Sequence, residues 1–233
     1  MLKALELLLR GLCKLLSQLL ICGSNLFSKR GSVLMLHSVG DDRHEFNVSV
    51  IQFEQLLKKL QHRRLIRLEE WEKDRDFLCI SFDDVPSSFY YNAYPLLKKY
   101  GIPFTIFVSC YLLDTENYIT TKMLQEIAEC ELCTIGSHGC FHSFYSKLSK
   151  EGAIEDLSFS KKRLEDMTHR YIELYAFPYG SIYACGLRHK KLVSSFYKYG
   201  FGTLKTPITK PSLLPRYFLP RINVDEALIS RLK

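Results

Sequence analysis

The chain carries the stretch Leu78-Cys79-Ile80-Ser81-Phe82-Asp83-Asp84, in which an apolar run ends abruptly in two carboxylates. A buried parallel strand has this pattern where it leaves its sheet. In folds built from such strands, the functional side chains lie at the carboxyl ends, where the loops begin. Asp83 and Asp84 are therefore a candidate site, although two adjacent carboxylates after a strand are, taken alone, more often a polar turn.

Short apolar runs alternate with amphipathic stretches on both sides of this strand. The pattern predicts strands near residues 33–36, 77–82, 104–108, 134–135, 171–177 and 201–204. It predicts helices over residues 50–60, 90–100, 121–129, 150–167 and 187–199. Such alternation indicates an α/β protein whose parallel sheet curls into a barrel with helices outside it.

Length and composition agree with one large globular domain. The 233 residues are 47% hydrophobic, which is enough to fill a core and excludes a disordered chain. The mean hydropathy of -0.06 excludes a polytopic membrane protein. Of the net charge of +7, residues 1–30 contribute +4, from five basic residues against one acidic residue. The remainder forms no basic stripe, so we expect no nucleic-acid partner.

The first 27 residues differ from the rest, because polar residues recur there at helical spacing among Leu and Ile. This predicts an amphipathic helix, and Arg10 and Lys14 interrupt the apolar run that a signal peptide or a spanning helix needs. Two interpretations remain, a helix lying on a membrane surface and a helix packed on the domain. We expect residues 1–30 to be this helix with its linker and residues 31–233 to be the barrel domain.

The eight cysteines are scattered through apolar contexts, in a chain large enough to fold without disulfides. We interpret most of them as buried free thiols, which favours a cytoplasmic location. If residues 1–27 bind lipid, we expect the protein at the inner membrane surface. Cys130 and Cys133 could form half of a zinc knuckle, but the chain has no second pair with matching spacing. Core packing is the preferred interpretation of this pair. The sequence does not indicate an oligomeric state.

Three further strand ends carry residues suited to chemistry. His138 and His142 follow the strand near 134–135, and on one turn of helix they would face the same way and bind one divalent ion. Pro178-Tyr179-Gly180 is a fixed turn that can aim the Tyr179 backbone N–H into a site, although such residues are also simply good turn formers. His37 follows the strand at 33–36, where a lone His is more often structural than catalytic.

Two imidazoles and one carboxylate are the ligand set of a catalytic metal site with an open coordination position. Zinc suits this set best, and cobalt, nickel or iron would also fit.

Together these parts resemble the polysaccharide deacetylase family, which shares the NodB homology domain. The similarity spans about residues 31–224 and is carried by residues 81–84, 94–108, 137–143, 177–180 and 219–222. The order of parts, with Leu36-His37 ahead of the Asp pair, is similar to the subgroup that acts on poly-N-acetylglucosamine. The resemblance implies a distorted (β/α) barrel of the NodB type, with fewer than eight strands.

The resemblance also implies a metal-dependent hydrolase that removes N-acetyl groups from N-acetylhexosamine units of a polysaccharide or lipid-linked glycan. The implied roles are Asp83 as general base, Asp84, His138 and His142 as metal ligands, His37 as general acid, and the Tyr179 N–H as oxyanion donor. We expect Pro178, Phe141 and Tyr183 to contact the sugar at the mouth of the site.

Two departures from the family pattern bear on this expectation. Val85 stands where the family has Gly, and a β-branched residue tolerates positive φ badly. The Arg that holds the base in many members is missing from its motif. Arg216 or Arg221 could replace it, with Arg221 the better match, unless Arg221 is a surface residue paired with Asp225 or Glu226.

The departures leave two alternatives open. One is a non-catalytic carbohydrate-binding or assembly protein on the same barrel. The other is an esterase that removes O-acetyl groups with the same residues.

Overall fold

The computed structural model describes residues 31–40, 47–73, 76–186, 189–208 and 216–231. The helix expected over residues 1–27 lies outside these ranges, so its membrane contact, the two-part domain division and the cellular location stay predictions. In the described ranges, no helix combines the length and apolar character that a membrane span requires.

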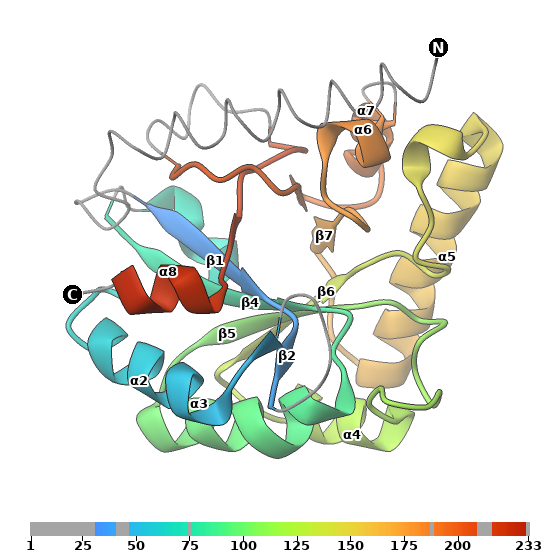
Figure 1. The fold of residues 1–233 in the computed structure, drawn as a ribbon. Helices are drawn as coiled ribbons and strands as arrows, with labels where there is room; N and C mark the ends of the chain where they lie inside the picture. The colour runs from blue at the N-terminus through green and yellow to red at the C-terminus, as the bar shows by residue number, and fades with distance from the viewer. Residues whose placement is uncertain (1–30, 41–46, 74–75, 187–188, 209–215, 232–233) are drawn as a thin grey trace, which may run out of the picture.

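Seven parallel strands form one curled sheet in the order β8-β7-β6-β5-β4-β1-β9 (Figure 1). They are β1 (Ser32–Leu36), β4 (Leu78–Asp83), β5 (Phe104–Val108), β6 (Cys133–Ser137), β7 (Leu174–Ala176), β8 (Tyr199–Phe201) and β9 (Ile222–Asn223). Two short strands, β2 (Ser38–Val39) and β3 (Asn47–Val48), form a separate parallel pair. The predicted parallel sheet is confirmed.

A C-terminal segment links the two edges of this sheet. The backbone of Leu219 pairs with the edge of β8 opposite Phe201, donating to the Gly200 carbonyl at 2.8 Å and accepting from the Gly202 N–H at 2.9 Å. Three residues later, Ile222 pairs with Leu34 of β1. The segment therefore closes the gap between β8 and β1 and draws the sheet into a barrel.

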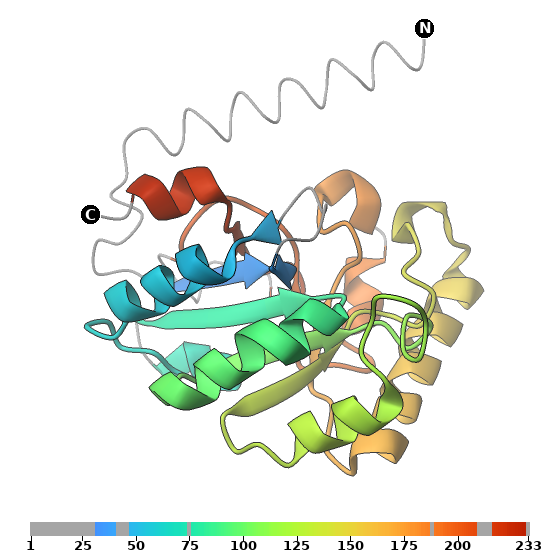
Figure 2. The same cartoon turned by 60° about the horizontal axis from the view of Figure 1, so that its bottom comes forward.

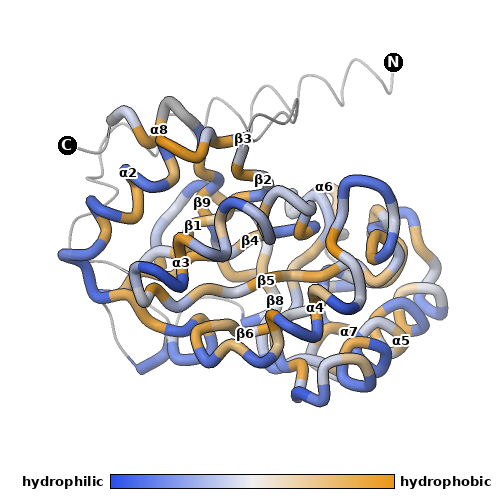
Figure 3. The backbone as a smooth tube through the Cα atoms, turned by 90° about the horizontal axis from the view of Figure 1, so that it is seen from below, coloured by the Kyte–Doolittle hydropathy of each residue, from blue (hydrophilic) through white to orange (hydrophobic). Residues whose placement is uncertain are grey.

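Helices cover the outside of the barrel, with α8 beside α2, α2 beside α3, and α4 beside α5 (Figures 1 and 2). They are α2 (Val50–Leu60), α3 (Tyr94–Tyr100), α4 (Thr121–Ala128), α5 (Lys150–Thr168), α6 (Ile182–Cys185), α7 (Lys190–Val193) and α8 (Glu226–Arg231). Three further turns are η1 (Leu68–Lys73), η2 (Phe89–Ala93) and η3 (Tyr145–Lys147). Figure 3 shows the apolar colours concentrated on central strands such as β5, whereas α5 is largely hydrophilic.

Local sequence accounts for where the longer helices begin and end. Ser49, Thr120 and Ser149 precede α2, α4 and α5, and each side chain accepts a backbone N–H three residues on. Gly101 ends α3 in the left-handed conformation, with φ 62°, which costs Gly little.

The predicted helix over 187–199 is wrong in its length, because α7, Lys190–Val193, is the only helix that the structure describes from residue 189 to residue 199. After it, the backbone N–H groups of Ser194 and Ser195 bond three residues back, and the Ser194 hydroxyl donates to the Lys191 carbonyl. Serine side chains compete in this way with the helical hydrogen-bond pattern. The short elements α6, β9 and α8 were not predicted.

The residues of β4 alternate between the two faces of the sheet. Its even-numbered residues from Leu78 onward pack with the helices, whereas Cys79 belongs to a second apolar cluster. This cluster fills the barrel interior, where Phe107 of β5 meets Phe201 of β8 with ring centroids 5.7 Å apart. By the same period of two, Asp83 faces the interior at the carboxyl end of β4.

Candidate metal and catalytic site

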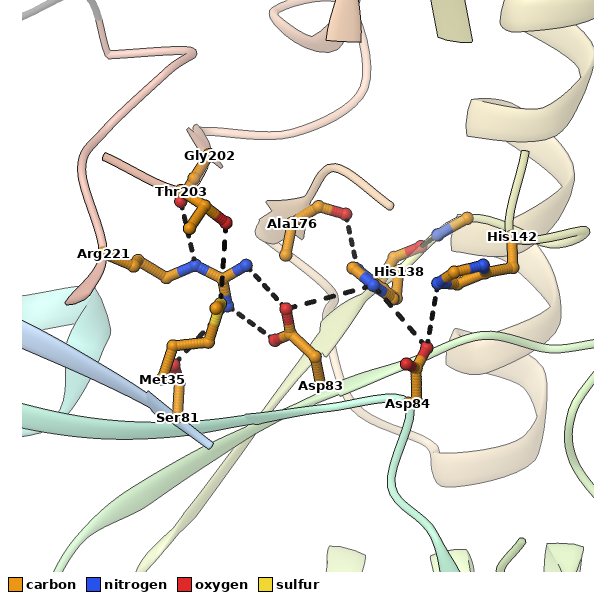
Figure 4. A network of polar contacts seen from close by, with 12 residues as sticks. Met35, Ser81, Asp83, Asp84, His138, His142, Ala176, Gly202, Thr203 and Arg221 are labelled. Carbon is orange, nitrogen blue, oxygen red and sulfur yellow. Dashed lines mark hydrogen bonds and ion pairs between the residues drawn. The ribbon is translucent and has the colours of Figure 1, made fainter. Parts of the chain in front are cut away.

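The three predicted metal ligands meet at the carboxyl end of the barrel. The ligand atoms of Asp84, His138 and His142 all lie within 4.8 Å of one another. Asp84 Oδ1 lies 3.1 Å from Nε2 of His142 and 3.7 Å from Nε2 of His138 (Figure 4). Of the residues described, no other group of three or more His, Cys, Asp or Glu side chains could hold a metal ion in this way.

A loop brings the two imidazoles together, and the helical turn that their spacing would also fit does not form. His138 follows β6 directly, Gly139 has a φ of 76°, and His142 has a φ of 49°, so the backbone takes a positive φ twice within five residues. Asp156 of α5 accepts the backbone N–H groups of residues 140 and 141, at 3.0 and 3.2 Å, which a helical turn would direct along its own axis. Those N–H groups are thereby oriented toward α5.

The protonation of His138 suits metal binding. Its Nδ1 lies 2.8 Å from the Ala176 carbonyl, which can only accept, so Nδ1 carries the proton. The lone pair is then on Nε2, which faces Asp84. A second partner that orients the imidazole in this way is typical of metal-ligating His. The donor set of two imidazole nitrogens and one carboxylate oxygen therefore fits a divalent transition metal.

The charges of this cluster shift its pKa values in opposite directions. Burial by itself would raise the pKa of Asp84, but the hydrogen bond from His142 and the charges of His138 and His142 hold it well below its usual value. Burial lowers the pKa of His138, against the pull of Asp83 and Asp84. Burial also lowers the pKa of His142, but the hydrogen bond to Asp84 and the charge of Asp84 outweigh burial and raise this pKa. Asp84 is therefore ionised and His138 is neutral near pH 7.

Arg221 forms a two-pronged ion pair with Asp83. Its guanidinium donates to both carboxylate oxygens, at 2.6 and 2.7 Å, and Arg221 is fully buried. The guanidinium also lies over the Phe107 ring, 5.0 Å from its centroid. The surface interpretation of Arg221 is therefore wrong. Arg216 instead lies at the surface, 3.3 Å from Glu72.

This pair controls the ionisation of Asp83. Burial raises the pKa of its carboxyl group, but the charges of Arg221 and His138 outweigh burial and bring the pKa below its usual value. Asp83 is thus a carboxylate at neutral pH, 3.9 Å from Nε2 of His138.

The predicted general acid and oxyanion donor lie around the same cluster. His37 is close enough for its charge to help lower the pKa values of Asp83 and Asp84. The ring of Tyr179 lies 4.7 Å from that of His142, between centroids, and the Tyr179 backbone has a φ of 61°. Within the described part of the chain, the Tyr179 backbone N–H has no hydrogen-bond acceptor.

The predicted sugar contacts lie at different depths. Pro178 is buried in the turn before Tyr179, whereas Phe141 and Tyr183 are exposed, by 57% and 54%. Phe141 lies in the loop between His138 and His142, and Tyr183 lies on the surface of α6. Their contact with substrate stays a prediction.

Sequence reasoning missed three residues near the site. Tyr111 pairs with Phe141 at the rim, with ring centroids 6.0 Å apart. Tyr118 is half-buried, and burial together with the charge of Asp84 raises its pKa. Asp156 binds the loop that carries the two imidazoles. All three come from segments outside the motifs, and their proximity results from long-range packing.

Val85 keeps the turn for which the family uses Gly. Asp84 and Val85 have φ values of 62° and 53°, so both adopt the left-handed conformation. The Val85 side chain is fully buried, and its carbonyl accepts the Ile119 N–H at 3.3 Å. Packing thus compensates for a backbone state that is unfavourable for a β-branched residue.

Comparison with known proteins agrees with this geometry. The family profile described as "Polysaccharide deacetylase" matches residues 71–192. A poly-beta-1,6-N-acetyl-D-glucosamine N-deacetylase of Staphylococcus aureus is 32% identical over 203 residues, covering 78% of this chain and 69% of the relative.

Solved structures share the fold. IcaB from Ammonifex degensii superposes with a TM-score of 0.75 at 22% identity, covering 88% of this chain and 96% of that protein. The deacetylase PplD of Streptococcus pyogenes gives a TM-score of 0.76 at 20% identity, covering 88% of this chain and 98% of that protein. The barrel, the family profile and the sequence relatives agree, and the chain belongs to the polysaccharide deacetylase family.

Proposed function

We propose that the protein is a metal-dependent hydrolase that removes N-acetyl groups from N-acetylhexosamine units, with poly-N-acetylglucosamine or a lipid-linked glycan as the substrate class. The observation that carries this proposal is the meeting of two carboxylates with different partners at one end of the barrel. Asp84 faces two imidazoles, and Asp83 faces a buried guanidinium. One carboxylate is thereby suited to a cation and the other to a proton.

Asp84, His138 and His142 would hold the ion, and zinc is the cation that this set suits best. When bound, such a cation supplies Lewis acidity, which lowers the pKa of a water molecule and polarises a carbonyl oxygen. The three residues supply one negative charge and two neutral donors. The site can therefore retain net positive charge when loaded.

The remaining residues would move protons and stabilise charge. An amide is a poor electrophile with a poor leaving group, so its hydrolysis needs a base, an acid and an oxyanion donor. Asp83 is ionised and can accept a proton from water, while His37 can donate one to the departing amine. The Tyr179 N–H can donate to the oxyanion. Each acid or base step of this kind contributes about 10²- to 10⁴-fold in rate.

The structure weakens the case for a non-catalytic binding protein. That alternative rested on Val85 and on the missing motif Arg. Val85 keeps the left-handed turn, and Arg221 supplies a bidentate partner to the base from another segment. An O-acetyl esterase would use the same residues, so substrates must separate the two activities.

The test is acetate release from N-acetylglucosamine oligomers and from lipid-linked acetamido sugars, with and without a chelator. We expect release that the chelator abolishes and Zn²⁺ restores. Asp83→Asn should lose at least about 10²-fold in kcat while its metal content stays that of the wild type. An O-acetylated xylan control identifies the esterase. Release that persists in chelator, or no release from any amide substrate, contradicts the proposal.

A further inference from the structure

A buried carboxylate on α5 has no part in the chemistry proposed above. Asp156 is only 3% exposed, yet both of its oxygens are used. Oδ1 accepts the backbone N–H groups of Cys140 and Phe141, at 3.0 and 3.2 Å, and Oδ2 accepts the Tyr145 hydroxyl. An ionised carboxylate is an acceptor only, and hydrogen bonds to it are stronger than those to a neutral acceptor.

The N–H groups that Asp156 binds belong to the loop between the two ligating imidazoles. The opposite side of this loop is fixed by the end of β5, because the backbone N–H groups of Cys110 and Tyr111 donate to the carbonyls of residues 139 and 140, at 3.2 and 2.8 Å. The loop is thus bound from both sides. Residues 140 and 141 have little freedom to change their orientation.

The consequence falls on His142, which follows this bound segment directly. Its backbone φ of 49° is unfavourable for a non-glycine residue, so the surrounding contacts must impose it. Gly139 shows how closely the loop approaches Asp156, since a Cβ at that position would lie 2.7 Å from Oδ2. The loop backbone packs directly against the carboxylate.

We propose that Asp156 is a positioning residue for the metal site. It holds the loop so that Nε2 of His142 faces Asp84, and in this way it sets the affinity of the site for a divalent cation. The inference rests on the proposed function for the role of the metal, but the contacts that carry it join the Asp156 carboxylate to the loop and involve no metal ligand atom. The competing explanation is that Asp156 only stabilises the packing of α5.

The experiment compares Asp156→Ala, Asp156→Asn and the wild type. Ser160→Ala is the matched control, because Ser160 is fully buried on the same helix and its hydroxyl bonds to Tyr197 and the Leu157 carbonyl, not to residues 139–142. Co²⁺ is titrated by its d–d absorption, Zn²⁺ by competition, and thermal unfolding of the metal-free proteins measures stability.

We expect Asp156→Ala to weaken Co²⁺ and Zn²⁺ binding by about 10- to 100-fold, the loss typical of outer partners of metal ligands. Asp156→Asn should lose less, about 3- to 10-fold, because its amide oxygen still accepts the two N–H groups but carries no charge. Ser160→Ala should change the unfolding temperature and leave the dissociation constants unchanged.

Binding within about twofold of the wild type in Asp156→Ala overturns the proposal, as does an equal loss of affinity in Ser160→Ala. If Asp156→Ala does not fold, Asp156→Asn decides in the same way. Hydrogen exchange of the Cys140 and Phe141 amides in the metal-free proteins is the second readout, and it should accelerate in both Asp156 variants. A wild type that binds no cation contradicts the proposed function, and exchange then tests the positioning role by itself.

Discussion

The ionisation of Asp83 depends most on Arg221, which lies 138 residues away in the chain. A carboxylate buried at the end of a barrel would take up a proton unless a cation and hydrogen bonds compensated for its lost hydration. Arg221 does both, because its planar fork matches the two carboxylate oxygens. A Lys at this position would supply charge without the paired geometry.

Replacing Arg221 should therefore change the pH dependence of the reaction. In Arg221→Met the burial of Asp83 remains while the lowering by the guanidinium is lost, so the pKa of Asp83 rises. The base is active when ionised, and the acid limb of kcat/KM against pH should move to higher pH. Removing one partner of a buried pair should also reduce the free energy of unfolding by about 3–5 kcal/mol.

Arg216→Met is the matched control, because Arg216 forms a pair with Glu72 at the surface. Its pH profile should be that of the wild type, and its stability should fall by about 0–1 kcal/mol. If the acid limb of kcat/KM lies at the same pH in Arg221→Met as in the wild type, Arg221 does not control the ionisation of Asp83.

At the scale of the element, β4 delivers its two carboxylates to different places. Asp83 is the last residue of the strand and faces the interior, and the next two residues adopt the left-handed conformation. The backbone thus turns between Asp83 and Asp84, so that one side chain meets Arg221 and the other meets the imidazoles (Figure 4). A regular strand would have placed the second carboxylate on the outer face.

The strain at Val85 predicts an unusual order of stabilities. Within helices and strands, a protein with Ala at a given position is more stable than the same protein with Gly there by about 0.5–1 kcal/mol. At a left-handed position Ala carries a steric cost of about 1–2 kcal/mol that Gly avoids. Val85→Gly should therefore unfold at a higher urea concentration than Val85→Ala, although both lose the packing of the buried Val side chain.

Ala153→Gly supplies the comparison, because Ala153 is buried within α5. The free energy of unfolding of this variant should be about 1 kcal/mol below that of the wild type, because in a helix Ala is more favourable than Gly. If Val85→Ala proves more stable than Val85→Gly, the residue does not hold strain in solution.

At the scale of the molecule, the site exists only when the barrel is closed. Its groups come from the ends of β4 and β6, from the turn after β7 and from the C-terminal segment that joins β8 to β1. A cation that binds these groups in the folded state should stabilise the whole domain by mass action.

Zn²⁺ at about 100 times its dissociation constant should therefore add about 2.7 kcal/mol to the free energy of unfolding. For a domain of this size the melting temperature should rise by about 5–10 °C. Differential scanning calorimetry with Zn²⁺ and with chelator measures this shift. His142→Ala should show little of it, and an equal shift in that variant would mean that Zn²⁺ binds elsewhere.

The sequence predicted those features that depend on local pattern. Apolar runs ending in polar residues located the strands and, with them, Asp83, Asp84 and His138. The spacing of His138 and His142 fits both a helical turn and a loop, and the choice depends on Asp156, sixteen residues beyond Cys140.

Other features depend on contacts between distant segments. The strand β9 has only two residues, which is too short for a period of two to be visible, and it forms because β1 offers a free edge. The sequence alone does not decide whether Arg216 or Arg221 pairs with Asp83, because that contact also joins distant segments. Only the closed barrel shows which Arg reaches the interior.

The central claim is that Asp84, His138 and His142 bind one cation, and elemental analysis of the purified protein tests it most directly. Wild type and His142→Ala are compared after incubation with Zn²⁺ and gel filtration, with circular dichroism to confirm that both are folded. We predict about one transition-metal ion per wild-type chain and almost none in the variant. Equal metal content in the two proteins, or a folded wild type without bound metal, would contradict the account.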